Sequence, residues 1–226
     1  MVDYQQLEIE MEIRITSNDL AGFEKQDRTN LVNGLSGYKS AHLIGTCNKM
    51  GKTNLAIFSS VIHIGASPAL MGFIQRPVSV ERHTYENILE TGEFTINHVP
   101  LEYFKNAHQT AARFEKEQSE FDLCGFSMQY SEILKAPYVL QSEIKIGLKL
   151  EEIVEIKANK TLLVIGKVEE ILMNSTFVTE TGAINLSAAR TILVHGLETY
   201  YKAEQIGVLP YAKPNLNVLE KKQNEN

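Results

Sequence analysis

The chain is poor in the features of secreted, membrane-spanning and nucleic-acid-binding proteins. Its 226 residues include only two cysteines, Cys47 and Cys124, which lie far apart and favour a reduced, cytoplasmic protein. No apolar run approaches the roughly 20 residues that cross a bilayer, and the acids among residues 7–12 exclude a signal-peptide core. The 22 basic and 28 acidic residues form no long block of one sign, so we expect neither a nucleic-acid nor a membrane partner.

Repeats and linkers are missing as well. No stretch rich in proline, glycine or serine divides the chain, so we expect residues 1–213 to form a single domain. With 43% hydrophobic residues, this domain can bury a sizeable core. Residues 214–226 are polar and charged, and we expect a C-terminal tail there, or an arm that lies on a partner.

Hydrophobic periodicity predicts strands along most of the chain. The expected strands are residues 40–47, 55–64, 69–75, 94–99, 143–150 and 161–172. Short connections join the first three, which predicts an antiparallel meander. The fourth and fifth alternate between apolar and other side chains. The last is apolar at nearly every position, which favours a strand covered on both faces.

Two helices are expected between these strands. Thr84 is placed to cap a helix that ends just before Gly92, and residues 101–114 carry apolar side chains along one helical face. Six or more strands with only two clear helices do not make repeated βαβ units. The expected fold class is therefore mainly β (α+β), an antiparallel barrel with inserted helices.

Motifs for phosphate loops, metals and nucleophilic serines are near misses or absent. Residues 45–53 resemble a phosphate-binding loop, but five residues separate the glycines where the motif has four, and a strand-like segment follows. A hairpin turn at residues 48–52 is the better interpretation. The six histidines show no metal-ligand spacing, and no Gly-x-Ser-x-Gly occurs. We expect no metal site and identify no catalytic residue.

The informative pattern is the order of six short segments. They are residues 53–60 (with Asn-x-Ala-x-Phe-Ser), 67–73 (with a Ser-Pro turn), 82–88 (Arg-x-Thr-x-x-Asn-Ile), 91–97 (with Gly-Glu-Phe-x-Ile-Asn), 119–126 and 135–142. No segment is specific alone, but the six in this order resemble the flavin reductase-like, FMN-binding split-barrel family, in its flavoredoxin-like branch. The resemblance covers about residues 35–170.

The resemblance implies a split barrel that binds FMN. The cofactor-binding residues that it implies are Thr46, Asn54, Phe58, Ser59, Ser60, Arg82, His83 and Thr84. Arg82 offers a fork of donors, and Thr84 a hydroxyl at the start of a helix whose free amides favour an anion. Residues 58–60 would pass the flavin ring. An ordinary surface helix, capped by Thr84, is the alternative reading of the same residues.

Three functions stay open. The first is an FMN-dependent oxidoreductase that takes electrons from NADH or NADPH and passes them through flavin N5 to a small-molecule acceptor. The second is a non-enzymatic flavin-binding protein or electron carrier of the flavoredoxin type. The third is a barrel that has lost flavin and serves as an interaction protein. Short reductases of the family often carry a His where nicotinamide docks, and this chain has Lys160 or Thr161 there. For His195, flavin contact and a structural role both remain open.

The resemblance also implies a homodimer with FMN at or near the interface. A barrel of about six short strands has an interior that its own side chains fill. A flavin must then lie on the outside, where a second copy of the chain is the economical cover.

Overall fold

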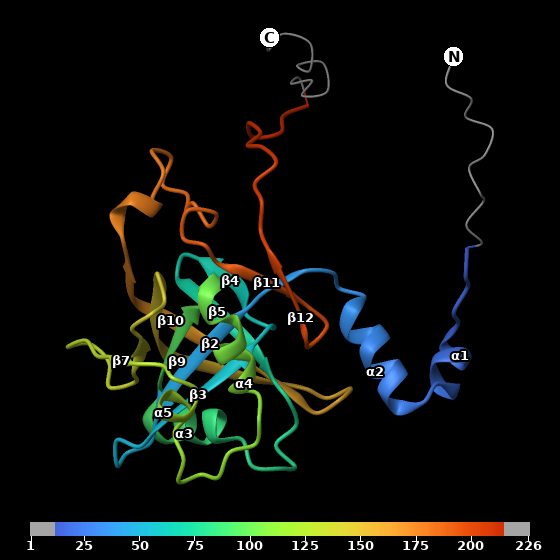
Figure 1. The fold of residues 1–226 in the computed structure, drawn as a ribbon, viewed down its shortest axis with the longest axis horizontal. Helices are drawn as coiled ribbons and strands as arrows, with labels where there is room; N and C mark the ends of the chain where they lie inside the picture. The colour runs from blue at the N-terminus through green and yellow to red at the C-terminus, as the bar shows by residue number, and fades with distance from the viewer. Residues whose placement is uncertain (1–11, 215–226) are drawn as a thin grey trace.

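A computed structural model describes residues 12–214 of the chain (Figure 1). Its helices are α1 (Ser17–Gly22), α2 (Lys25–Gly34), α3 (His83–Thr91), α4 (Phe104–Gln109) and α5 (Glu120–Leu123), with 3-10 turns η1 (Leu101–Tyr103) and η2 (Ser175–Phe177). Its strands are β1 (Lys39–Ser40), β2 (His42–Cys47), β3 (Thr53–Phe58), β4 (Ile62–Ala66), β5 (Ala69–Gln75), β6 (Glu93–His98), β7 (Met128–Gln129), β8 (Tyr138–Val139), β9 (Ile144–Ile156), β10 (Thr161–Met173), β11 (Ile192–His195) and β12 (Thr199–Lys202). Of the tail predicted at residues 214–226, all but Pro214 lies outside the described residues.

One seven-stranded antiparallel sheet, in the order β3-β2-β6-β9-β10-β5-β4, forms the body of the molecule. β3 and β4 are its two edges, yet only Ser59, Ser60 and Val61 separate them in the chain. A connection this short reaches at most about 14 Å, so the sheet curls until its edges approach. The Ser60 hydroxyl bonds both the carbonyl oxygen and the N–H of Ile74 in β5, at 3.2 and 3.1 Å. The predicted antiparallel barrel with inserted helices is confirmed.

The antiparallel pairs of the predicted meander are confirmed, but its middle strand is wrong. Residues 55–64 are divided between β3, which pairs with β2, and β4, which pairs with β5. Barrel closure is the physical reason, because β3 and β4 lie at opposite edges of the sheet and the chain must cross between them. Periodicity within a segment predicts extended structure but does not show where closure of the sheet divides it.

The helices also differ from the expectation. Thr84 lies inside α3 and makes no cap bond, while the Glu86 carboxylate accepts from the N–H of Arg82, the residue at the cap position, at 3.1 Å. Gly92 ends the helix at φ 72°, as predicted. The helix expected to run to residue 114 ends at Gln109, because i to i−3 bonds at Thr110 tighten its last turn. No helix within residues 12–214 is long and apolar enough to span a bilayer.

The barrel interior is filled by side chains. Its core consists of Ile44, Phe73, Ile88, Phe94, Ile96, Ile146, Leu148 and Val164. A Cβ added to Gly166 would lie 2.5 Å from Phe94 Cζ, so not even a methyl group fits there without a shift. A second core lies between the outer face of β2 and β3 and helices α4 and α5. A ligand must therefore bind outside the barrel.

The long hairpin of β9 and β10 is buried only in part. Each strand has 13 residues, and the run of buried residues in β10 is limited to Val164–Gly166. The expectation that residues 161–172 are covered on both faces is wrong within the single chain, since the ends of the hairpin extend past the core. Ile171 is 51% exposed. The alternation predicted for residues 143–150 is confirmed, with Ile144, Ile146 and Leu148 buried.

A histidine pair spans two neighbouring strands. His42 of β2 lies opposite His98 of β6, and their rings meet edge to face with centroids 4.6 Å apart. His42 is buried, and its Nδ1 has no hydrogen-bond partner among residues 12–214. Burial, with a smaller contribution from His98, lowers the pKa of His42 well below 6.5. Burial also lowers the pKa of His98 to about 4.

We expect the free energy of unfolding to fall as the pH falls from 6.5 towards about 4. In this window the histidines of the unfolded chain bind protons that the folded His42–His98 pair does not bind. Each such proton lowers the free energy of unfolding by about 1.4 kcal/mol per pH unit. Above pH 6.5 this contribution to stability is fully present. Urea unfolding should show that the stability of His98→Gln depends less on pH than that of the unmodified chain. The control variant His63→Gln, at an exposed site on β4, should show the same pH dependence as the unmodified chain. An unchanged dependence in His98→Gln would contradict the assignment.

Candidate functional site

Four buried polar residues join the start of α3 to the hairpin of β2 and β3. Asn54 donates from Nδ2 to Thr84 Oγ1 at 3.0 Å, and Asn87 donates from Nδ2 to Thr46 Oγ1 at 3.1 Å. Each threonine hydroxyl therefore keeps its own proton, and residues 12–214 supply no further hydrogen-bond partner for it. The predicted site residues Thr46, Asn54 and Thr84 are thus brought together.

The hairpin that links β2 to β3 turns as expected. The Asn48 side chain accepts from the N–H groups of Met50 and Lys52 at 3.0 and 2.9 Å, and Gly51 has φ 81°. β3 follows directly, so no helix start is present to bind nucleotide phosphates. Within residues 12–214, no group of three or more His, Cys, Asp or Glu side chains is placed to hold a metal ion.

A buried carboxylate accepts a hydrogen bond from the backbone of β3 in this region. Glu120, at the start of α5, accepts from the N–H of Leu55 at 2.9 Å, and burial raises the pKa of its carboxyl. The neighbouring Ser119 hydroxyl bonds Thr53 Oγ1 at 2.8 Å. Sequence reasoning did not single out Glu120 or Asn87, although both lie in segments that carry the family resemblance. Their hydrogen bonds to Leu55 and Thr46, which are distant in the sequence, are what distinguish them.

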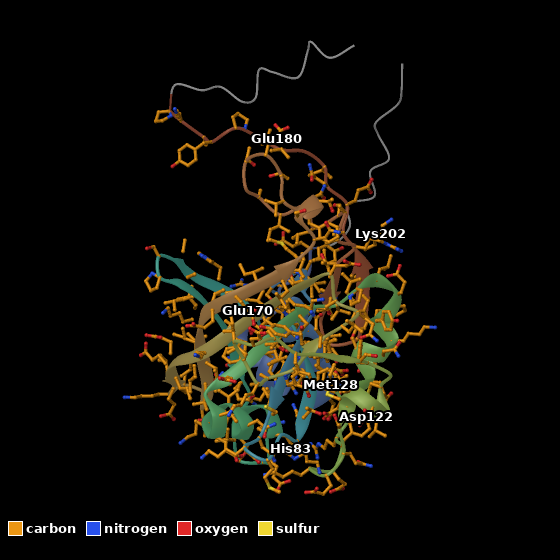
Figure 2. All side chains as sticks on the ribbon, turned by 90° about the vertical axis from the view of Figure 1, so that its left-hand side faces the viewer. His83, Asp122, Met128, Glu170, Glu180 and Lys202 are labelled. Atoms are coloured by element: carbon orange, nitrogen blue, oxygen red, sulfur yellow. The ribbon has the colours of Figure 1, made fainter. Side chains whose placement is uncertain are left out.

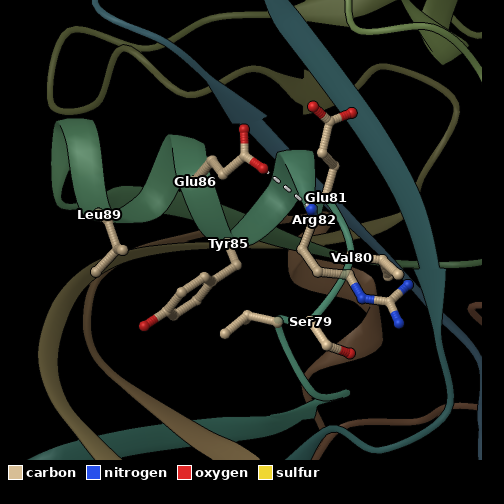
Figure 3. Close-up of a pocket in the computed structure, with 8 residues that line it drawn as sticks. Ser79, Val80, Glu81, Arg82, Tyr85, Glu86 and Leu89 are labelled. Carbon is tan, nitrogen blue, oxygen red and sulfur yellow. Dashed lines mark hydrogen bonds between the residues drawn. The ribbon is translucent and has the colours of Figure 1, made fainter.

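Beside α3 lies an open hollow of about 300 Å³ (Figure 3). Its lining residues are Val78, Ser79, Val80, Glu81, Arg82, Tyr85, Glu86 and Leu89. Figure 3 shows Tyr85 and Leu89 descending from the helix on one side, with the Arg82 side chain extending on the other. The hollow therefore combines apolar walls with one partly buried guanidinium and the carboxylates of Glu81 and Glu86.

Arg82 has no carboxylate partner within 4.0 Å among residues 12–214. Its Nε donates to the carbonyl oxygen of Pro77 at 3.4 Å. Burial lowers the pKa of Arg82, and the positive charges of Arg76 and Arg113 lower it further. A partly buried cation without a carboxylate partner favours an anionic ligand.

His83 follows Arg82 and lies at one end of the barrel, remote from Glu180 at the other (Figure 2). Its Nε2 is 3.9 Å from Glu81 Oε2. It lines a second, much smaller hollow together with Asn54, Asn87 and residues of the 111–119 segment, which joins α4 to α5. His83 thus lies between the buried polar residues and the solvent.

The predicted ring-contact residues Phe58, Ser59 and Ser60 lie where the chain leaves β3. The Phe58 ring meets Phe73 edge to face, with centroids 4.9 Å apart, and Ser60 bonds Ile74. Ser59 is partly exposed and makes no side-chain hydrogen bond among the described residues. Phe58 and Ser60 have structural roles in the barrel, and the flavin contacts of all three stay predictions.

The comparisons with known proteins agree with this geometry. The family model described as "Flavin reductase like domain" matches residues 35–196. The chain belongs to the flavin reductase-like family. A split-barrel protein of Shewanella frigidimarina NCIMB 400, assigned to the flavin reductases, is 42% identical, with a TM-score of 0.86 over 89% of this chain and 100% of that chain.

Two more distant structures share the fold of this flavin reductase-like chain. Nitrilotriacetate monooxygenase component B from Bacillus cereus is 22% identical, with a TM-score of 0.77 over 88% of this chain and 99% of that one. Flavoredoxin of Desulfovibrio vulgaris (Miyazaki F) is 18% identical, with a TM-score of 0.67 over 78% of this chain and 92% of that one. The predicted resemblance is confirmed, and family membership assigns the chain a flavin-related oxidoreductase role.

We expect Thr84→Val to lower the free energy of unfolding by about 1–3 kcal/mol, because it leaves the buried Asn54 amide without its acceptor. Thr199→Val is the matched control, since Thr199 is exposed on β12 and makes no side-chain hydrogen bond among the described residues. Urea unfolding at pH 7.5 measures both. A Thr84→Val variant as stable as the control would show that the Asn54 bond contributes nothing.

Proposed function

We propose that the chain is an FMN-dependent oxidoreductase of the flavin reductase-like type. The unpaired, partly buried Arg82 at the start of α3, beside a hollow with apolar walls, carries this proposal. FMN ends in a phosphate dianion, which requires cations and hydrogen-bond donors. Its ring system requires mostly apolar walls with a few polar groups. Family membership at residues 35–196 supports the same cofactor.

The residues present fit that cofactor. Arg82 and His83 would contact the phosphate, and the free protons of the Thr46 and Thr84 hydroxyls are within the same polar cluster. The filled barrel interior requires an external site, where Ser59 is partly exposed. When bound, FMN supplies a centre that accepts and passes on electrons at N5. The chain positions this group, binds its charge and limits its contact with water.

NADH or NADPH is the proposed electron donor, and the acceptor is a small molecule. The entry to β10 favours the electron carrier as the second candidate. There the Asn159 side chain accepts from the N–H and the hydroxyl of Thr161 at 3.1 and 2.7 Å, and Lys160 has φ 59°. This tight turn contains no histidine. NADH consumption under air with added FMN distinguishes a reductase from a carrier.

We expect Arg82→Ala to weaken FMN binding roughly tenfold or more, because a charge-assisted hydrogen bond contributes about 1.5–3 kcal/mol. Riboflavin, which lacks the phosphate, should bind both proteins equally and more weakly than FMN. Fluorescence titration measures the four dissociation constants, and Arg82→Lys should fall between the parent and Arg82→Ala. Unchanged FMN affinity in Arg82→Ala would refute the phosphate assignment.

We also propose a homodimer that covers the flavin. α1 and α2 contribute no buried residue and stand to one side of the barrel (Figure 1). Large apolar side chains are exposed on and after α2 and on the edge strand β4, namely Val32, Leu35, Tyr38, Ile62 and Ile64. Apolar surface of this kind favours burial against a second copy.

Sedimentation equilibrium should give about twice the 25.4 kDa chain mass at micromolar concentration. Leu35→Asp should shift the mass towards the monomer, because it places a charge in the proposed interface. Leu123→Asp, at an exposed position on α5, should not. A monomeric parent chain that still binds FMN tightly would contradict the dimer.

A further inference from the structure

The segment after β12 exposes apolar side chains that the described part of the chain does not cover. Residues 204–214 follow this last strand and are exposed at every position. Four large apolar side chains are among the most exposed of the described residues, namely Ile206, Val208, Leu209 and Tyr211, at 102, 82, 76 and 85%. Figure 1 shows the segment, in red, extending away from the barrel. We call residues 204–214 the C-terminal arm.

The arm is uncharged along most of its length. Between Glu204 and Lys213 it contains no charged residue, and it makes no hydrogen bond within residues 12–214. Exposed clusters of apolar side chains mark surfaces that bind another molecule. Because the arm has no cluster of basic residues, it lacks the charge that attracts a segment to a membrane surface. A protein surface with equally little charge is therefore the partner that it fits.

The seven-stranded sheet has one edge that the chain covers and one that it leaves free. At the β3 edge, the Glu120 carboxylate accepts from the N–H of Leu55 at 2.9 Å, and the Ser119 hydroxyl bonds Thr53 Oγ1 at 2.8 Å. At the other edge β4 pairs with β5, and residues 12–214 supply no further hydrogen bond to its backbone. Such an edge presents unpaired N–H and C=O groups to any extended chain that approaches it.

β4 has few of the features that protect an edge strand. Charged side chains, proline and bulges usually do so. β4 has no acidic residue, lysine, arginine or proline, and its one protecting feature is a bulge between His63 and Gly65. Its Ile62 and Ile64 are 44 and 37% exposed. An extended, uncharged segment with β-branched side chains is the chemical complement of this strand, and the arm is such a segment.

The arm is long enough to cover the strand. Residues 204–211, fully extended, span at most about 28 Å, whereas the five residues of β4 span about 17 Å. Ile206 and Val208 recur at the period of two that places side chains on one face of a strand. Pro210 lacks an N–H, but an added strand becomes the new edge, where proline is tolerated.

We propose that the C-terminal arm of each subunit crosses to the other subunit and adds a strand to the free edge of β4. The inference rests on the homodimer of the proposed function and deepens it, because it names the segment and the strand that join the two copies. Ile62 and Ile64, which also belong to the proposed interface, are then covered by the arm of the partner. Each chain supplies one arm and one free edge, so a twofold dimer satisfies both at once.

Cross-linking tests the exchange directly. The native cysteines Cys47 and Cys124 are buried, so His63→Cys on the exposed edge strand and Val208→Cys on the arm supply the accessible thiols. When the two variants are expressed together, a short bismaleimide should link them into a covalent dimer, and neither variant alone should form one.

Three cross-linking results would overturn the exchange. The first is the absence of a covalent dimer from the co-expressed pair. The second is an intrachain link as the sole product of a chain that carries both substitutions, which would place the arm on its own β4. The third is a covalent dimer of His63→Cys alone, which would show that two β4 strands meet each other directly.

Dissociation of the dimer gives an independent measurement. Val208→Asp and Leu209→Asp place a charge on the arm, and each should raise the dissociation constant of the dimer roughly tenfold or more. Leu123→Asp, on α5, should change it by less than about twofold. Sedimentation velocity measures the three constants, and thermal melting checks that these exposed substitutions leave the fold intact.

Failure of this inference and failure of the proposed dimer give different results. If the parent chain is a dimer and both arm variants dissociate as it does, the arm exchange is overturned and the homodimer stands. If the parent is a monomer at micromolar concentration, the homodimer fails, and this inference fails with it. Titration of the parent with FMN tests the proposed cofactor separately in either case.

Discussion

Closure of the barrel depends on the short crossing from β3 to β4, where three residues connect the two edges of the sheet. Because the connection is so short, the seven strands cannot lie flat. The Ser60 hydroxyl takes the place of a strand pairing at this point and bonds both backbone groups of Ile74. The positions of β5, of the loop after it and of α3 all follow from where this crossing leaves the chain.

The filled interior of the closed barrel also determines where a ligand can bind. Phe94 and its neighbours fill the interior so tightly that Gly166 has no room for a Cβ. Polar groups are therefore gathered on the outside, at the end of the barrel where α3 begins. Two amide-to-hydroxyl bonds fasten α3 to β2 and β3, and the buried Glu120 holds the backbone of β3 at Leu55.

Local patterns predicted those parts that local chemistry controls. Gly92 ends α3 because a left-handed residue is required there, and the hairpin at residues 48–52 forms because Asn48 bonds its backbone. The single strand predicted at residues 55–64 was wrong, because closure of the whole sheet divides it into β3 and β4. Thr84 was expected to cap α3 because its position in the sequence fits a helix cap. Its hydrogen-bond partner in the structure is Asn54, which is 30 residues away and cannot be inferred from local spacing.

The sequence by itself determined the class of the fold, the family and most of the residues that gather at the start of α3. Periodicity, turn residues and the order of six segments are properties of the chain alone. Only the tertiary structure decided the strand order, the role of Ser60, and the contacts of Asn54 with Thr84 and of Leu55 with Glu120. These partners are 30 and 65 residues apart, and no spacing along the chain encodes a distance that barrel closure creates.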